Sequence, residues 1–281
     1  LGNIKNKQMT KLKTLLLLTL SLTIISCSSD DDNNNSEPND SLDLVKSIDD
    51  GFKINYTYSN GLFTNASGSD MGNSLEINYT YDSNNRVSSI SSSETSGSDS
   101  FDFSTNYSYD NNGRLVSSTS QGQTTSYDYS GNTVSIGSNG NSGIQLELDG
   151  NGKVIRLNSS DFYKIFTYDN NENLVLNEEF DNNDVITKKY EYSYDQNLNP
   201  FFNQLESIYL EKFIGFFVGS GISFTDSFFF DFPYLKNNLI SSSFNDGTPD
   251  TFTFELNSNG FPTTISEVQS DGFTNEYIIE Y

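Results

Sequence analysis

Residues 107–116 read Tyr-Ser-Tyr-Asp-Asn-Asn-Gly-Arg-Leu-Val and carry the clearest structural signal in the chain. Together with Phe101 and Phe103, its two tyrosines share one parity, so the four rings lie on one face of an extended strand. Asp110 and the two asparagines after it can bond the turning backbone, and Gly113 tolerates a positive φ. The stretch therefore predicts a strand end, a three- or four-residue turn and a new strand.

The same unit recurs along most of the chain. Its turn aspartates lie 28, 20 and 26 residues apart in the pairs Asp82 and Asp110, Asp149 and Asp169, and Asp169 and Asp195. Each interval fits two strands and two turns, whereas parallel strands would need longer crossovers. We expect an all-β fold, an antiparallel meander of repeated hairpins that forms a curved sheet or a barrel-like structure. The Gly- and Ser-rich residues 91–100 and 138–143 are expected to form looser turns at the opposite end of the strands.

Residues 200–235 break the repeat and are predicted to form a short irregular or helical insertion. Residues 208–217 fit a short helix. The segment is rich in phenylalanine and favours one of two arrangements: a plug or cap whose rings are buried against the sheet or inside a closed barrel, or an exposed patch for a partner. A segment this rich in phenylalanine is usually buried, which favours the first arrangement. Its phenylalanines are Phe201, Phe202, Phe213, Phe216, Phe217, Phe224, Phe228, Phe229, Phe230 and Phe232.

The N-terminal region predicts export and lipid anchoring. Residues 1–26 form a signal peptide whose true start is Met9, with an apolar run of 11 residues, Leu15 to Ile25, that is too short to span a bilayer. The segment before Cys27 resembles a bacterial lipobox, which implies that this cysteine is lipidated. An ordinary secretory signal with an incidental cysteine is the alternative. Residues 27–41 then form a polar tether, and residues 42–281 form a single β domain.

The tether begins with a serine-then-acidic run that resembles the surface-export signal of Bacteroidota lipoproteins. The resemblance implies an outer-membrane, lipid-anchored protein that faces the cell exterior. The alternative is a plain solvated tether, because the residues that follow are also polar. The run consists of Ser28, Ser29, Asp30, Asp31 and Asp32.

Composition excludes several classes of function. The net charge is −23, and without the signal peptide 11 basic residues face 38 acidic ones, a net charge of −27. Such a surface repels nucleic acid and anionic membrane, so we expect no nucleic-acid partner and membrane contact through the lipid anchor only. The chain has no histidine and a single cysteine, which excludes serine–histidine and cysteine–histidine catalysis and zinc sites built on these residues.

Two family resemblances follow from these motifs. The unit at residues 107–115 resembles the YD repeat of Rhs-type shells. The whole chain resembles Bacteroidota lipoproteins of unknown function that have a porin-like fold, through Cys27, the closing strand Tyr277 to Tyr281 and the order of the degenerate motifs between them. The resemblance implies a curved or barrel-like antiparallel sheet and brings no catalytic residues. The outward apolar band of a membrane barrel is not evident in the sequence.

The best-supported function is a surface- or envelope-anchored binding or interaction module whose ligand is an extracellular glycan or a protein. A structural envelope scaffold is the alternative, and a carboxylate-dependent glycan hydrolase is a weaker one. We expect no enzyme activity, no cofactor and no metal, since turn chemistry explains the Asp- and Asn-rich loops that resemble part of a calcium site. The candidate aromatic binding face comprises Tyr79, Tyr81, Tyr107, Tyr109, Tyr192 and Tyr194.

Overall fold

The computed structural model describes residues 44–138, 141–202, 205–218 and 234–281. The helical elements in these ranges are η1 (Glu206–Ile208) and α2 (Tyr209–Val218). The strands are β1 (Ser47–Asp49), β2 (Ile54–Ser59), β3 (Leu62–Asp70), β4 (Asn73–Tyr81), β5 (Val87–Ser96), β6 (Asp99–Tyr109), β7 (Leu115–Ser120), β8 (Gln123–Ser130), β9 (Thr133–Ser138), β10 (Asn141–Leu148), β11 (Val154–Asn158), β12 (Phe162–Tyr168), β13 (Leu174–Asp181), β14 (Ile186–Leu198), β15 (Asn237–Phe244), β16 (Asp250–Leu256), β17 (Pro262–Val268) and β18 (Thr274–Glu280).

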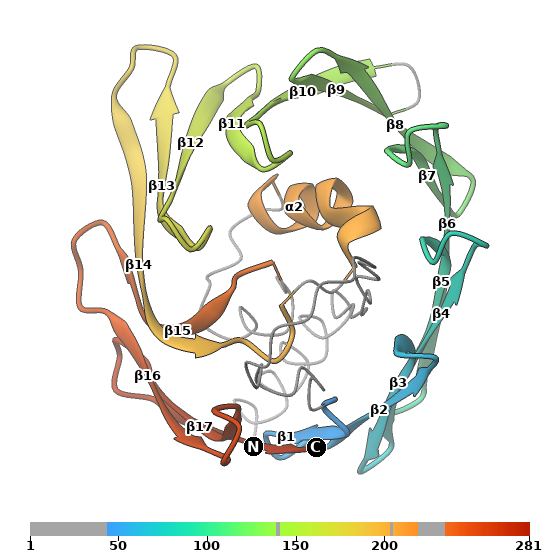
Figure 1. Ribbon diagram of the computed structural model, residues 1–281, viewed down its shortest axis with the longest axis vertical. Helices are drawn as coiled ribbons and strands as arrows, with labels where there is room; N and C mark the ends of the chain where they lie inside the picture. The colour runs from blue at the N-terminus through green and yellow to red at the C-terminus, as the bar shows by residue number, and fades with distance from the viewer. Residues whose placement is uncertain (1–43, 139–140, 203–204, 219–233) are drawn as a thin grey trace, which may run out of the picture.

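These strands form one closed antiparallel barrel (Figure 1). Each strand pairs with its neighbours in the chain, and the three-residue β1 closes the ring between β18 and β2. In the closing strand, Ile48 lies opposite Ile279 on one side and Ile54 on the other. The prediction of an all-β antiparallel meander is therefore confirmed. Of its two alternatives, the curved sheet and the barrel-like structure, the structure forms the barrel.

An aspartate organises the turn of the repeat unit. The Asp110 carboxylate accepts hydrogen bonds from the backbone N–H of Asn112 and Arg114, both at 2.9 Å, and from Nε of Arg114 at 2.8 Å. Gly113 has φ 82°, as its position in the turn requires. The prediction of a three- or four-residue loop is wrong by one residue, since residues 110–114 separate β6 from β7. The same pair of backbone bonds recurs at Asp82, Asp149, Asp169, Asp181 and Asn257.

Strand alternation puts apolar residues inside the barrel and polar residues outside. Along β4, Leu75, Ile77 and Tyr79 are buried, whereas the residues between them are exposed. The expectation of a loop over residues 91–100 is wrong, because only two residues separate β5 from β6. Of residues 138–143, the structure places 138 and 141–143 at the facing ends of β9 and β10, while 139–140 lie outside the described residues. A serine-rich segment can be a strand because the backbone bonds of a sheet do not depend on apolar side chains.

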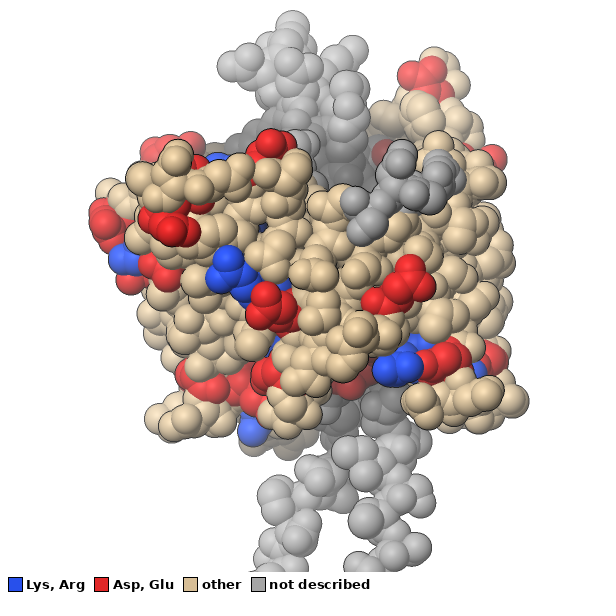
Figure 2. All heavy atoms as spheres, turned by 90° about the horizontal axis from the view of Figure 1, so that it is seen from above, with Lys and Arg blue, Asp and Glu red and all other residues tan. Residues whose placement is uncertain are grey.

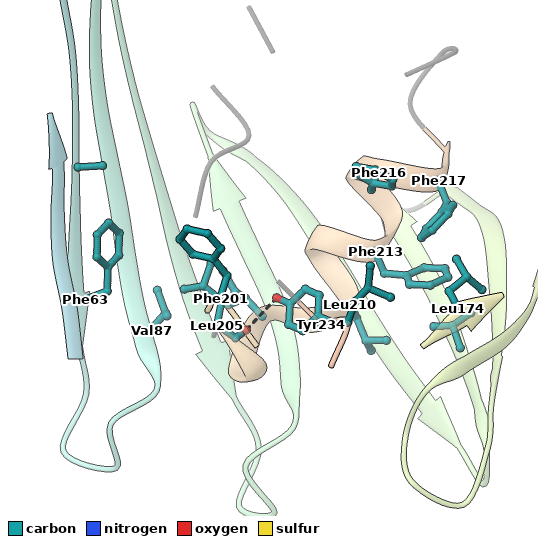
Figure 3. Close-up of a cluster of buried hydrophobic side chains, with 14 of the residues drawn as sticks. Phe63, Val87, Leu174, Phe201, Leu205, Leu210, Phe213, Phe216, Phe217 and Tyr234 are labelled. Carbon is teal, nitrogen blue, oxygen red and sulfur yellow. Dashed lines mark hydrogen bonds between the residues drawn. The ribbon is translucent and has the colours of Figure 1, made fainter. Parts of the chain in front are cut away.

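The insertion between β14 and β15 enters the barrel, and α2 lies within the ring of strands (Figure 1). Its rings meet the wall there: Phe213 and Phe217 lie 4.8 and 4.9 Å, centroid to centroid, from Phe166 of β12. Figure 3 shows these two rings on the side of α2 that faces Leu174 of β13. The predicted short helix and the burial of rings inside a closed barrel are thus confirmed for residues 205–218. Phe224 and the later phenylalanines of the segment lie outside the described residues.

Within the described ranges, no helix is both long and apolar enough to cross a membrane.

Candidate functional site

The six tyrosines of the predicted binding face all point into the barrel. Tyr79, Tyr107 and Tyr192 are at most 8% exposed and form part of the core. Tyr81, Tyr109 and Tyr194 are half-buried and pack against that core. The structure therefore places all six residues on the inner surface of the wall but in two separate groups, four on β4 and β6 and two on β14 across the barrel (Figure 1). Whether it binds a ligand stays a prediction.

The half-buried tyrosines have a structural use for both ring and hydroxyl. Tyr109 Oη donates to the carbonyl oxygen of Val87 at 2.6 Å, and the Arg86 guanidinium lies 4.4 Å from the centroid of the same ring. Burial raises the pKa of Tyr109 to about 12, so the hydroxyl remains a donor at neutral pH. Each such bond ties one strand to the strand or segment before it. The equivalent donors are Tyr58, Tyr81, Tyr168, Tyr194 and Tyr281.

The helical insertion, here called the plug (residues 205–218), is fixed to the wall by polar contacts as well as rings. Ser207 Oγ accepts a hydrogen bond from the N–H of Val87 at 3.1 Å, and Tyr209 Oη accepts one from the N–H of Val154 at the same distance. Both valines directly follow an aspartate turn, where the strand register shifts. The bulge that follows each turn therefore presents a backbone donor to the plug.

A charged group on the inner wall holds the other end of the helix. Lys164 Nζ donates to the carbonyl oxygen of Phe217 at 2.9 Å and lies 3.2 Å from the Glu179 carboxylate. Lys188 contacts the same carboxylate at 3.0 Å. Burial opposes ionisation of Glu179, but its bonds to the two lysines outweigh this effect and lower its pKa. A cation at the last turn of a helix is favourable, so this cluster stabilises the docked plug.

The plug also carries a carboxyl group in an unfavourable setting. Glu211 on α2 is only partly exposed, and its Oε2 atom is buried without a hydrogen-bond partner among the described residues. Burial raises its pKa, against the opposing effects of the Lys212 charge and of a hydrogen bond from Tyr107. A single buried acid next to tyrosines is not a catalytic pair.

The remaining predicted site residues are not placed. Cys27 and the run Ser28 to Asp32 lie outside the described residues, so lipidation and export stay predictions. Among the described residues, no cluster of three or more Asp, Glu or Cys side chains could hold a metal ion. In the turn that resembles part of a calcium loop, the Asp110 oxygens face backbone N–H groups and Arg114.

The outer wall carries a feature that the sequence reasoning missed. The face seen in Figure 2 is largely covered by uncharged residues, and its charged groups are scattered. On β4 to β6 the wall has a groove of about 510 Å³. No sequence signal points to it, because residues 88–93 read Ser-Ser-Ile-Ser-Ser-Ser and the groove is made by pairing between strands. Ser92 and Phe103 contribute to its lining, and the other lining residues are Asn78, Ser91, Ser93, Asp102, Ser104 and Gln121.

Comparisons with known proteins give fold-level likenesses only. No protein-family model and no curated protein matches the chain. Among solved structures, it is similar to a porin-like protein from Bacteroides uniformis, with 11% identity, a TM-score of 0.36, and coverage of 84% of this chain and 97% of that one. The expected membership of a lipoprotein or YD-repeat family stays a prediction.

Two larger assemblies also resemble the barrel. One is a complex described as TcdB2-TccC3-Cdc42, with 12% identity, a TM-score of 0.32 and coverage of 79% of this chain. The other is the Tc holotoxin pore of Photorhabdus luminescens, with 12% identity, a TM-score of 0.30 and coverage of 83%. This chain spans only 12% and 14% of the length of those chains.

Proposed function

We propose that this chain is a binding or interaction module, held at the outer membrane by lipid on Cys27, whose outer wall meets an extracellular glycan or protein. One observation supports the outer wall over the lumen. The inward rings pack against one another and against the plug, as at Phe213 and Phe166, so the aromatic surface is already occupied. The outward side chains instead face solvent, as the hydroxyl and amide groups of Asn78, Ser91 and Ser104 do on β4 to β6.

The wall is suited to this task because it is rigid and polar. A closed sheet has no free strand edge to pair with other chains, and the filled lumen fixes its curvature. Side chains on strands hold their positions more accurately than side chains on loops, which favours recognition of a polar ligand.

Protease shaving of intact cells tests the location. We expect the wild-type protein to be cleaved, and the variant with Asp30, Asp31 and Asp32 changed to alanine to be protected. The Cys27→Ala variant should be released from the membrane fraction. Protection of the wild-type protein in intact cells, with cleavage after lysis, would contradict a surface location.

A structural envelope scaffold is the second candidate, because a closed and filled barrel is also a suitable spacer. A deletion strain separates the two roles. A binding module predicts a defect limited to growth on, or adhesion to, one ligand, whereas a scaffold predicts detergent sensitivity under all growth conditions. Complementation with a variant altered only on the outer wall should restore a scaffold but not a binding module.

A further inference from the structure

The groove on the outer wall is built from outward positions of three paired strands. Asn78 of β4 lies opposite Ser91 of β5, which lies opposite Ser104 of β6. One step along the sheet, Ser93 lies opposite Asp102. Strand pairing therefore arranges amide, hydroxyl and carboxylate groups in two adjacent rows on the outer face of the barrel.

Most of these groups have no partner within the described part of the chain. The side chains of Ser91, Ser93, Asp102, Ser104 and Gln121 make no hydrogen bond to another described residue. Asn78 is the exception, because it accepts one from Asn65 at 2.9 Å and donates one to the Glu76 carboxylate at 3.5 Å.

Comparable hydroxyls beside the groove do have partners. Thr80 Oγ1 lies 2.7 Å from Ser88 Oγ and 2.8 Å from Ser89 Oγ, and the hydroxyls of Thr119 and Thr124 lie 2.9 Å apart. The groove thus gathers polar groups whose bonding capacity is open to a ligand, whereas these neighbouring hydroxyls bond one another.

The residues that line the groove indicate which class of ligand it can bind. Its lining contains one carboxylate, that of Asp102, and no lysine or arginine, so an anionic ligand is disfavoured. A carboxylate has two acceptor oxygens, an amide supplies both donors and acceptors, and a hydroxyl can do either. Adjacent hydroxyl groups of a sugar ring match this set, and the volume falls within the range of about 300–1,000 Å³ that holds small ligands.

We infer that this groove binds a neutral glycan, with Asp102 accepting hydrogen bonds from sugar hydroxyls and the serine and amide side chains completing the contacts. The inference rests on the proposed binding function and adds a site and a ligand class to it. It also places recognition on the outer wall, away from the tyrosines of the lumen.

Calorimetric titration of the full chain with neutral malto-, manno-, xylo- and galacto-oligosaccharides tests the site. We expect at least one to bind, and Asp102→Asn to weaken that binding by about 10-fold or more, since a neutral amide replaces the charged acceptor and one acceptor oxygen becomes a donor. The double variant Ser91→Ala with Ser104→Ala should weaken it as well. The matched control is Asp128→Asn, a carboxylate-to-amide change on β8 of the same wall, which should leave binding unchanged. Thermal melting confirms that the variants fold.

The possible outcomes distinguish failure of the groove as a glycan site from failure of the proposed binding function. Binding that is unaffected by the Asp102 and serine variants would overturn the groove while leaving a binding role in place. If no neutral oligosaccharide binds, but photo-crosslinkers at Ser93 on intact cells capture a protein, the glycan assignment fails and the interaction role stands. If neither occurs and the deletion strain is detergent-sensitive, both proposals fail in favour of the scaffold.

Discussion

At the residue scale, one aspartate per unit explains why the repeat turns where it does. A carboxylate that accepts from the N–H groups two and four residues later satisfies donors that the strand ladder leaves unpaired at the turn. In the unit at Asp110 the same group also binds the Arg114 guanidinium at 2.7 Å, and that guanidinium lies 4.3 Å from the ring centroid of Tyr129. The Tyr-Asp pairing in the sequence is therefore one connected set of contacts between consecutive hairpins.

Replacing this carboxylate should lower stability in a pH-dependent way. Hydrogen bonds from the backbone of Arg114 lower the pKa of Asp110 below its ordinary value of 3.8. Its folded pKa is thus below its unfolded one, so its contribution is present above the unfolded pKa and is lost as pH falls through the folded pKa. We expect Asp110→Ala to melt at lower temperature than wild type at pH 7, with the gap narrowing as the pH falls below 3.8. An equal effect of Asp128→Ala on the outer wall would contradict this role.

Replacing the Glu211 carboxylate should have the opposite effect and raise stability at neutral pH. Burial raises its folded pKa above its ordinary value of 4.5, so ionisation favours the unfolded state and the carboxyl destabilises the protein at neutral pH. We expect Glu211→Gln to raise the melting temperature at pH 7, and the gain to shrink as pH falls toward 4.5. The control, Glu76→Gln on the exposed outer wall, should change little. A lower melting temperature for Glu211→Gln at pH 7 would show that the ionised group is favourably bonded.

At the element scale, α2 acts as a packing core for the barrel. Phe213 is fully buried among Phe166, Phe217 and Tyr209. We expect Phe213→Ala to reduce the free energy of unfolding by about 3–5 kcal/mol. Phe101→Ala is the matched control, since that ring is 48% exposed, and should cost less than about 1 kcal/mol. Urea denaturation measures both; similar costs would mean that the plug does not support the wall.

The sequence predicted the elements that have a strong local signal. Tyrosine alternation ending in an Asp-x-x-Gly turn identified β6 and β7, and the apolar residues 208–217 identified α2 within one residue at each end. It did not identify the serine-rich half of β5, because a charged residue occupies an inward position there. This residue, Glu94, is only 7% exposed and lies opposite the apolar Leu75. The groove was missed for the same reason, since it is made by pairing between strands, which no single strand reveals.

At the scale of the whole molecule, closure depends on a contact between the two ends of the domain. β1 pairs with only three residues of β18, and Lys53 adds an ion pair to Glu280 at 2.9 Å. This contact joins residues that are more than 220 positions apart, so local periodicity could not distinguish the barrel from a curved sheet. The same closure removes the free edges that a polar, serine-rich sheet would otherwise expose.

Removing the last strand should therefore affect assembly more than its size suggests. Deletion of residues 274–281 leaves β17 and β1 each with one free edge. We expect this variant to associate through those edges and to elute as large species in size-exclusion chromatography with light scattering. Deletion of Tyr281 alone is the control. It removes the hydrogen bond from Tyr281 Oη to the carbonyl oxygen of Pro262 at 2.8 Å but keeps β18, so it should lower the melting temperature without association. If the longer deletion behaved like the control, the plug and the other seventeen strands would be sufficient to hold the sheet in its curved form.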